Sequence, residues 1–216
     1  MLPLHHHPLP APAPHLEEAG AAAPADCAAA MAFALWRAGG ADDPRPLAVA
    51  ATRHWLRERG RLFGRGAGRF GLAQDRLILI AAEREPQVLW AMEEALKSGA
   101  VCGAVAAVEN PPFVATRRLD FAAKAGGAAA VLLRTGPAAD LSAARLRWRI
   151  AASASAPHPF DPRAPGAARI ACELVRRRSG PLGQWMLEQD DETGGFHLAA
   201  GLADHGLVPG PAIAAA

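Results

Sequence analysis

Short apolar runs alternate with helical repeats along the first part of the chain. The clearest run is LILIA at residues 77–81, which is short, branched and continuous, as the fully buried strands of a parallel sheet are. Four further apolar runs are predicted as strands: residues 16–19, 47–51, 104–108 and 129–133. This part of the chain is therefore expected to form the interior of a sheet.

Segments with helical periodicity separate the predicted strands. The best defined helix begins near Pro86, repeats apolar residues at helical spacing as far as Leu96, and ends at Gly99. The other predicted helices are residues 25–38, 52–59 and 116–125. Strands separated by helices of this length imply right-handed crossovers and a mainly parallel sheet.

The pattern changes after Arg134. Residues 145–150 (RLRWRI) alternate strictly, which places Leu146, Trp148 and Ile150 on one face of a strand and the arginines on the other. Three more strands, separated by Pro and Gly turns, are predicted at residues 167–176, 184–188 and 196–199. The sequence therefore predicts an α/β fold whose mainly parallel sheet is flanked by helices and carries a C-terminal antiparallel extension.

Composition and length fit one globular domain with tails. The chain has 216 residues, of which 51% are hydrophobic and 20% charged. Residues 1–14 alternate Pro with Leu, Ala and His, which predicts a disordered arm. We expect residues 15–207 to form the domain and residues 208–216 to be a disordered tail. The histidines of the arm could bind a metal, but such a tract in a Pro-rich tail is usually solvated, and no metal site is expected.

Charge is balanced over the whole chain and uneven along it. The formal net charge is +2, so no global field indicates nucleic acid as a partner. Six arginines gather in and near two of the predicted strands: Arg145, Arg147, Arg149, Arg176, Arg177 and Arg178. They could bind phosphates or an acidic partner, or form a solvated face balanced by acids after residue 187; both interpretations stay open. Trp148 lies on the opposite strand face, which disfavours binding of single-stranded DNA.

Three features predict a cytoplasmic protein. The three cysteines lie far apart and form no CxxC pair, which fits a reducing compartment and argues against a zinc site. No apolar run reaches the length of a membrane span. The first residues also lack the basic and apolar regions of a secretory signal.

Several strings, and the order of the predicted elements, resemble the ImuA family of RecA-like proteins from bacterial inducible-mutagenesis cassettes. The matching strings are RLFGRGAGRFGLAQDRLILIAA, EPQVLWAMEEALKSGAVCGAVAAVE, TRRLDFAAKAGGAAAVLLR, SAARLRWRIAASAS and ELVRRRSGPLGQWMLEQD. The chain is more distantly similar to the SulA cell-division inhibitors. The resemblance implies a RecA-like core and a role in the damage-induced (SOS) response, in translesion DNA synthesis. It implies as partners a Y-family-like polymerase homologue (ImuB), an error-prone replicative-type polymerase and, as a further candidate, RecA. Direct contact with DNA stays open.

The phosphate-binding loop of a RecA-type ATPase is degenerate in this chain. Such a loop reads GxxxxGK[ST], and the corresponding segment here runs from Gly20 to Cys27. Asp26 stands in place of the lysine, and Cys27 in place of the hydroxyl that binds magnesium. Neither lysine of the chain, Lys97 or Lys124, lies in a strand-to-helix turn after a glycine. We therefore expect no nucleotide cofactor.

No other catalytic arrangement is apparent in the sequence. Glu109 follows a predicted strand where an ATPase keeps its Walker B acid, but without a phosphate loop it is better interpreted as an acid in a turn. The serines and histidines are dispersed and no serine lies in a GxSxG motif. The sequence thus predicts a protein that binds partners and is not an enzyme. The alternative is a SulA-like inhibitor that caps a cell-division polymer, and the neighbouring genes would distinguish the two.

Overall fold

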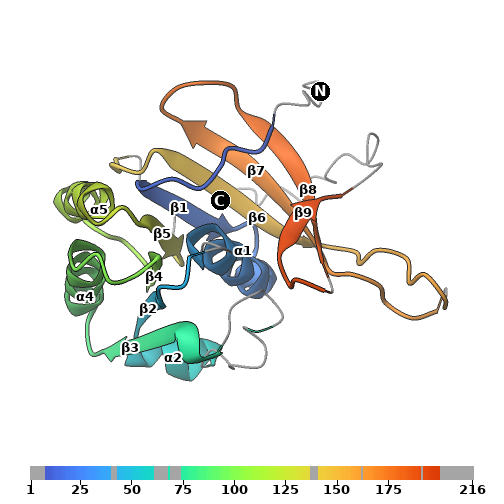
Figure 1. Cartoon of the computed structure of the whole chain (residues 1–216), viewed down its shortest axis with the longest axis horizontal. Coiled ribbons are helices and arrows are strands. Elements are labelled where there is room, and N and C mark those ends of the chain that lie inside the picture. The colour runs from blue at the N-terminus through green and yellow to red at the C-terminus, as the bar shows by residue number, and fades with distance from the viewer. Residues whose placement is uncertain are drawn as a thin grey trace, which may run out of the picture.

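Nine strands form one sheet in the computed structural model of the chain (Figure 1). The structure describes residues 8–39, 43–60, 68, 74–136, 141–161, 163–190 and 192–199. The strand order is β3-β2-β4-β5-β1-β6-β7-β8-β9. Neighbouring strands from β3 to β6 are parallel, and β7, β8 and β9 extend the sheet with antiparallel pairs. The predicted combination of a parallel sheet and an antiparallel C-terminal extension is confirmed.

The elements follow the predicted order. The strands are β1 (Leu16–Ala21), β2 (Leu47–Thr52), β3 (Leu77–Ala82), β4 (Gly103–Val108), β5 (Ala129–Arg134), β6 (Leu146–Ser153), β7 (Arg169–Arg177), β8 (Gly183–Gln189) and β9 (Phe196–Leu198). The described helices are α1 (Cys27–Gly39), α2 (Arg53–Arg59), α4 (Glu85–Lys97) and α5 (Phe113–Gly126). Short 3-10 turns precede α1 (Pro24–Asp26) and β3 (Gln74–Arg76).

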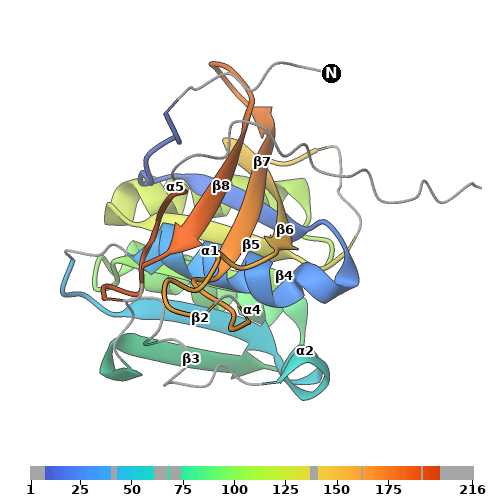
Figure 2. The same ribbon diagram turned by 90° about the vertical axis from the view of Figure 1, so that its right-hand side faces the viewer.

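Two apolar layers hold the helices against the sheet. The core that contains α1 also takes in partly buried residues of α2, whereas the core that contains α4 and α5 lies on the other face. Figure 2 shows the central strands between these layers. Every residue of β4 (GAVAAV) is buried, because this strand is covered on both faces. Strands β6 and β7 pack one face on the α1 core, and no described helix packs on their other face.

Some element boundaries differ from the predicted ones for local reasons. Helix α5 begins at Phe113, three residues before the predicted start, directly after Pro112 in an extended conformation. Its end is set by Gly127, whose φ of 61° is the left-handed conformation that closes helices. Helix α2 begins one residue late because the side chain of Thr52 caps it, accepting a hydrogen bond from the amide of Trp55 at 3.1 Å.

The expected disordered arm needs a correction at Leu9 and Pro10. Leu9 packs against the α1 core, and the carbonyl of Pro10 accepts a hydrogen bond from the buried Arg37. The first seven residues with their histidines, most of the loop at 61–73, and the tail at 208–216 lie outside the described residues. In the part of the chain that is described, no helix combines the length and apolar character needed to cross a bilayer.

Candidate functional site

The loop after β1 is closed by its own hydrogen bonds. The amide of Ala22 donates to the carbonyl of Ile150 on β6 at 2.7 Å. Asp26 accepts from the amide of Ala23 at 3.0 Å and from the amide of Ala152 at 2.9 Å. A phosphate-binding loop instead leaves its amides free to point at the anion. Asp26 thus fastens the loop to β6, and two loop amides are already committed.

A cavity of about 500 Å³ opens beside this loop. Its wall combines the last residues of β1 and the loop that follows (20–24), residues 133–136 at the end of β5, and residues 147–149 of β6. The cavity lies at the carboxyl ends of the parallel strands β1 and β5, beside the first half of β6. The carboxyl ends of parallel strands are where open α/β sheets bind ligands. Cys27, the first residue of α1, lines the cavity, and so does Gly20 of β1.

A buried carboxylate offsets the arginines around the cavity. Glu18 on β1 is completely buried and accepts hydrogen bonds from Arg134 at 3.2 Å and Arg147 at 2.8 Å. Arg149 pairs with Glu173 across the β6–β7 ladder. Of the lining arginines, Arg59 is exposed and has no ion pair among the described residues. The cavity therefore carries a modest positive excess and no concentrated anion cage.

A second buried carboxylate lies on the opposite face of β1. Glu17 receives two hydrogen bonds from the guanidinium of Arg37 on α1 and one from the indole of Trp148 at 2.7 Å. Burial alone would raise the pKa of Glu17, but His15 beside it, the charge of Arg37 and these hydrogen bonds together lower it below 4.5. Arg37 also lies 5.2 Å from the centre of the Trp148 ring. Neither Glu17 nor Glu18 was singled out from the sequence. Two adjacent acids within a short, otherwise apolar strand could have indicated buried carboxylates.

The six arginines predicted as a binding face differ in their surroundings. Arg147 lines the cavity, and its side chain is only 14% exposed. Arg176 lies opposite it on β7 and donates to the carbonyls of Ser142 and Ala144. Burial, followed by the charge of Arg147, lowers the pKa of Arg176. These two arginines are structural parts of the sheet.

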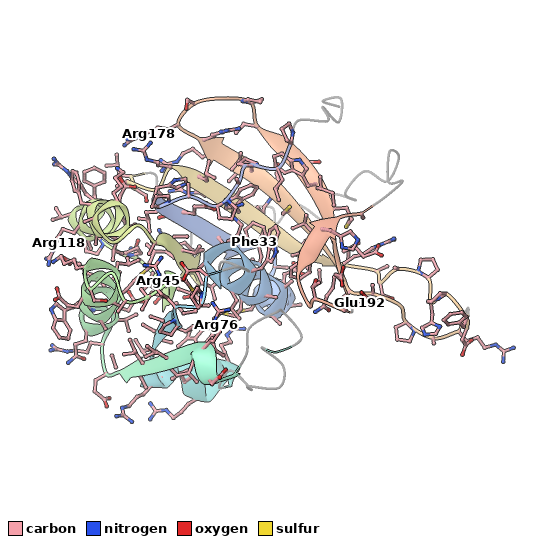
Figure 3. All side chains as sticks on the ribbon, viewed as in Figure 1. Phe33, Arg45, Arg76, Arg118, Arg178 and Glu192 are labelled. Atoms are coloured by element: carbon pink, nitrogen blue, oxygen red, sulfur yellow. The ribbon has the colours of Figure 1, made fainter. Side chains whose placement is uncertain are left out.

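Arg145 and Arg178 are neighbours, since the amide of Arg178 donates to the carbonyl of Arg145 at 3.1 Å. Arg145 precedes β6 and lies 3.8 Å from Asp120 of α5. The register of β6 and β7 shifts between Arg147 and Trp148. As a result Arg176 lies opposite Arg147, and Arg177 lies opposite Leu146 on the other face of the strands. Arg178 is exposed beyond the end of β7 (Figure 3).

The interpretation of the β6 arginines as uniformly solvated is therefore wrong for Arg147. We expect Arg147→Ser to lower the free energy of unfolding by about 1–2 kcal/mol, because Glu18 loses a charged hydrogen-bond donor. Arg149→Ser, at an exposed position, should cost less than about 1 kcal/mol. Urea unfolding of the two variants measures the difference. Equal stabilities would show that Glu18 does not depend on Arg147.

The alternation itself was predicted correctly. Leu146, Trp148 and Ile150 are buried against α1, where Trp148 packs edge-on against Phe33 with ring centres 5.3 Å apart. Figure 3 shows Phe33 projecting from α1 toward this part of the sheet. The inward assignment of these residues is confirmed.

The remaining candidate residues have structural positions. Glu109 follows β4 in an exposed turn, where its amide donates to the carboxylate of Glu85, and it does not line the cavity. Burial raises the pKa of the Cys172 thiol to about 12, and burial also raises the pKa of Cys102. Within the described ranges, no three His, Cys, Asp or Glu side chains lie close enough together to hold a metal ion.

Comparison with known proteins decides the family. No protein-family model matches the chain. The proteins named Protein ImuA from two strains of Caulobacter vibrioides (NA1000 / CB15N and ATCC 19089 / CB 15) are each 35% identical to it over 164 residues, which covers 70% of this chain and 67% of the relative. The chain belongs to the ImuA family. The resemblance inferred from the sequence strings is confirmed.

A solved structure gives a further comparison for this ImuA family member. The crystal structure of SulA from Pseudomonas aeruginosa resembles it with a TM-score of 0.43 and 26% sequence identity. That likeness covers 55% of this chain and 96% of the SulA chain.

Proposed function

We propose that this ImuA family member is a non-catalytic accessory protein of damage-induced mutagenesis with a RecA-like core. It acts in translesion DNA synthesis by binding a Y-family-like polymerase homologue (ImuB) and an error-prone replicative-type polymerase, with RecA as a further proposed partner. Membership of the ImuA family supports the process. The parallel strand order around β1, with a loop leading from β1 into α1, supports the RecA-like core.

The closed loop after β1 is the observation that carries the non-catalytic part of the proposal. An ATPase must present free amides, a lysine and a magnesium-binding hydroxyl at this position. Here Ala22 and Ala23 donate their amides within the protein, and the aspartate that replaces the lysine accepts hydrogen bonds from the loop and from β6. A protein that lacks this chemistry would act by binding other molecules at its surface.

We expect no binding of ATP. Titration of MgATP into the protein to millimolar concentration should give no saturable heat, because an anion near Asp26 meets a carboxylate and committed amides. Isothermal calorimetry measures this, with a RecA-type ATPase in the same buffer as positive control. A micromolar affinity would contradict the assignment of the loop.

Genetics tests the proposed process. Deleting the gene should lower the frequency of mutations after ultraviolet irradiation, and a plasmid copy should restore it. Strong expression of the protein should leave cell division unchanged, whereas a division inhibitor would produce filaments. The sequence match favours the mutagenesis role over the division role. Filamentation without any effect on mutation frequency would overturn the proposal.

A further inference from the structure

Helices α4 and α5 expose an apolar and basic surface that the site around β1 does not use. Four large apolar side chains are exposed there: Trp90 by 61%, Phe113 by 46%, Val114 by 67% and Phe121 by 57%. Single exposed apolar residues are ordinary on a protein surface, but a group on two adjacent helices usually marks a binding site. We call this group, together with Arg117, Arg118 and Lys124, the α4–α5 platform.

Contacts between the helices make the platform one surface. Arg118 of α5 pairs with Glu93 of α4 at 2.7 Å. On a helix, side chains three or four positions apart are neighbours. Trp90 precedes Glu93 by three positions on α4, while Val114 and Phe121 flank Arg118 by four and three positions on α5. Figure 3 shows Arg118 on the outer side of α5, toward α4.

The exposed charges of α5 are all positive. Arg117, Arg118 and Lys124 are exposed, whereas Asp120, the one acid of this fully described helix, is buried. Asp120 is also neutralised, since it pairs with Lys124 and lies beside Arg145. On α4, the exposed Glu94 lies 3.3 Å from Lys97, and the buried Glu93 pairs with Arg118 and Lys97. Among the described residues, Arg117 is the one cation of the platform without an ion pair, so the platform carries a small positive excess around its apolar side chains.

We propose that the α4–α5 platform docks an acidic polypeptide segment that carries apolar side chains, contributed by the polymerase-homologue partner. This inference rests on the proposed function. Aromatic and arginine side chains dominate the energetic centres of protein interfaces, and charge complementarity selects an acidic segment.

Two features favour a polypeptide over a nucleic acid at the platform. Val114 is aliphatic and has no ring on which a base can stack. The ring of Phe121 already has Arg117 at 5.6 Å and Lys124 at 5.5 Å from its centre, and these cations compete with a stacking base. Both features suit an interface in which acidic side chains meet the cations and apolar ones cover Val114 and Phe121.

Two variants of the full chain test the docking site. The platform variant combines Val114→Ser, Arg117→Glu and Phe121→Ser; all three positions are exposed, so its melting temperature should stay close to that of wild type. The control variant makes two of these types of change at exposed positions elsewhere: Arg57→Glu matches Arg117→Glu, and Phe160→Ser matches Phe121→Ser. Arg117→Glu alone provides a milder second platform variant, should the triple change disturb folding.

Binding to the purified polymerase homologue and to a labelled 30-nucleotide oligo-dT is measured for each protein. We expect the platform variant to bind the polymerase homologue at least about tenfold more weakly than wild type, as loss of a central interface residue does, and the control variant to bind normally. Wild-type binding should also weaken as salt rises. A folded platform variant that binds as wild type does would overturn the docking site and leave the proposed function standing.

The other outcomes separate the remaining possibilities. Wild-type protein that does not bind the polymerase homologue would overturn the proposed function itself, and the docking site with it. Oligo-dT binding by wild type that is lost only in the platform variant would overturn the polypeptide occupant and make the platform a nucleic-acid site. Equal loss of partner binding in the platform and control variants would also overturn the proposal, since the effect would not belong to this surface.

Discussion

Replacing Arg37 with Met should lower the free energy of unfolding by about 3–5 kcal/mol. The Arg37 side chain is fully buried, and its guanidinium is the one arginine partner of the buried Glu17 among the described residues. Met fills a similar volume, so the lost stability comes mainly from leaving the Glu17 carboxylate buried without its positive partner. Urea unfolding monitored by tryptophan fluorescence measures it.

Two controls isolate the charge at this position. The double variant Glu17→Gln with Arg37→Met removes both charges and should recover part of the stability lost in the single variant. Arg57→Met, at an exposed position of α2, should change the stability by less than about 0.5 kcal/mol. A single Arg37→Met variant as stable as wild type would mean that Glu17 is not held as a buried anion.

The dependence of stability on acidic pH should also reveal the buried carboxylate of Glu17. The pKa of Glu17 in the folded protein lies below its ordinary value of 4.5, so the ionised form contributes stability above that pH. That contribution is lost as the pH falls below 4.5 toward the folded-state pKa. The double variant lacks this titration, and its stability should therefore fall less steeply than that of wild type over the same pH range.

The second large effect is expected at Gly126, where α5 crosses α4. A Cβ atom at this position would lie 1.9 Å from the carbonyl oxygen of Leu96, which is backbone and cannot rotate away. We expect Gly126→Ala to cost about 3 kcal/mol of unfolding free energy, in spite of the better helix propensity of Ala. Chemical denaturation measures the loss.

Gly20→Ala is the matched control for this substitution. The same added methyl group there would meet nothing closer than the Trp148 carbonyl oxygen at 3.9 Å. We expect a change below about 1 kcal/mol. Similar losses in both variants would show that the close helix crossing at Gly126 is not what limits the stability.

Sequence patterns predicted the strands of the sheet because their apolar runs are continuous. Residues 77–81 and 104–108 have no polar position, and both form strands in the structure. Strand β4 is fully buried, but the expectation of a buried strand at 77–81 is wrong, because β3 ends the strand order and exposes Ile78 by 45% and Leu79 by 53%. The start of α5 was missed because Phe113 and Val114 are exposed and break the helical periodicity of the residues that follow them. Their exposure is also the basis of the α4–α5 platform.

The candidate site was harder to predict because its partners are far apart along the chain. Glu18 is 116 positions from Arg134 and 129 positions from Arg147. Alternation alone identified which face of β6 is buried, but the acids that neutralise its arginines come from β1 and β7. The residue pattern of one strand does not show which strands lie beside it in the sheet, so it cannot predict these ion pairs.

The bonds that close the loop after β1 would oppose the introduction of a phosphate-binding site there. A chain engineered with Asp26→Lys and Cys27→Thr would carry the lysine and the hydroxyl that an ATPase has in this loop. The amide of Ala22 would still donate to Ile150, and the amide of Ala152 on β6 would lose its acceptor. The two substitutions would therefore weaken the attachment of the loop without freeing the amide of Ala22 for a phosphate. A phosphate-binding loop at this place would require changes both in the loop and in β6.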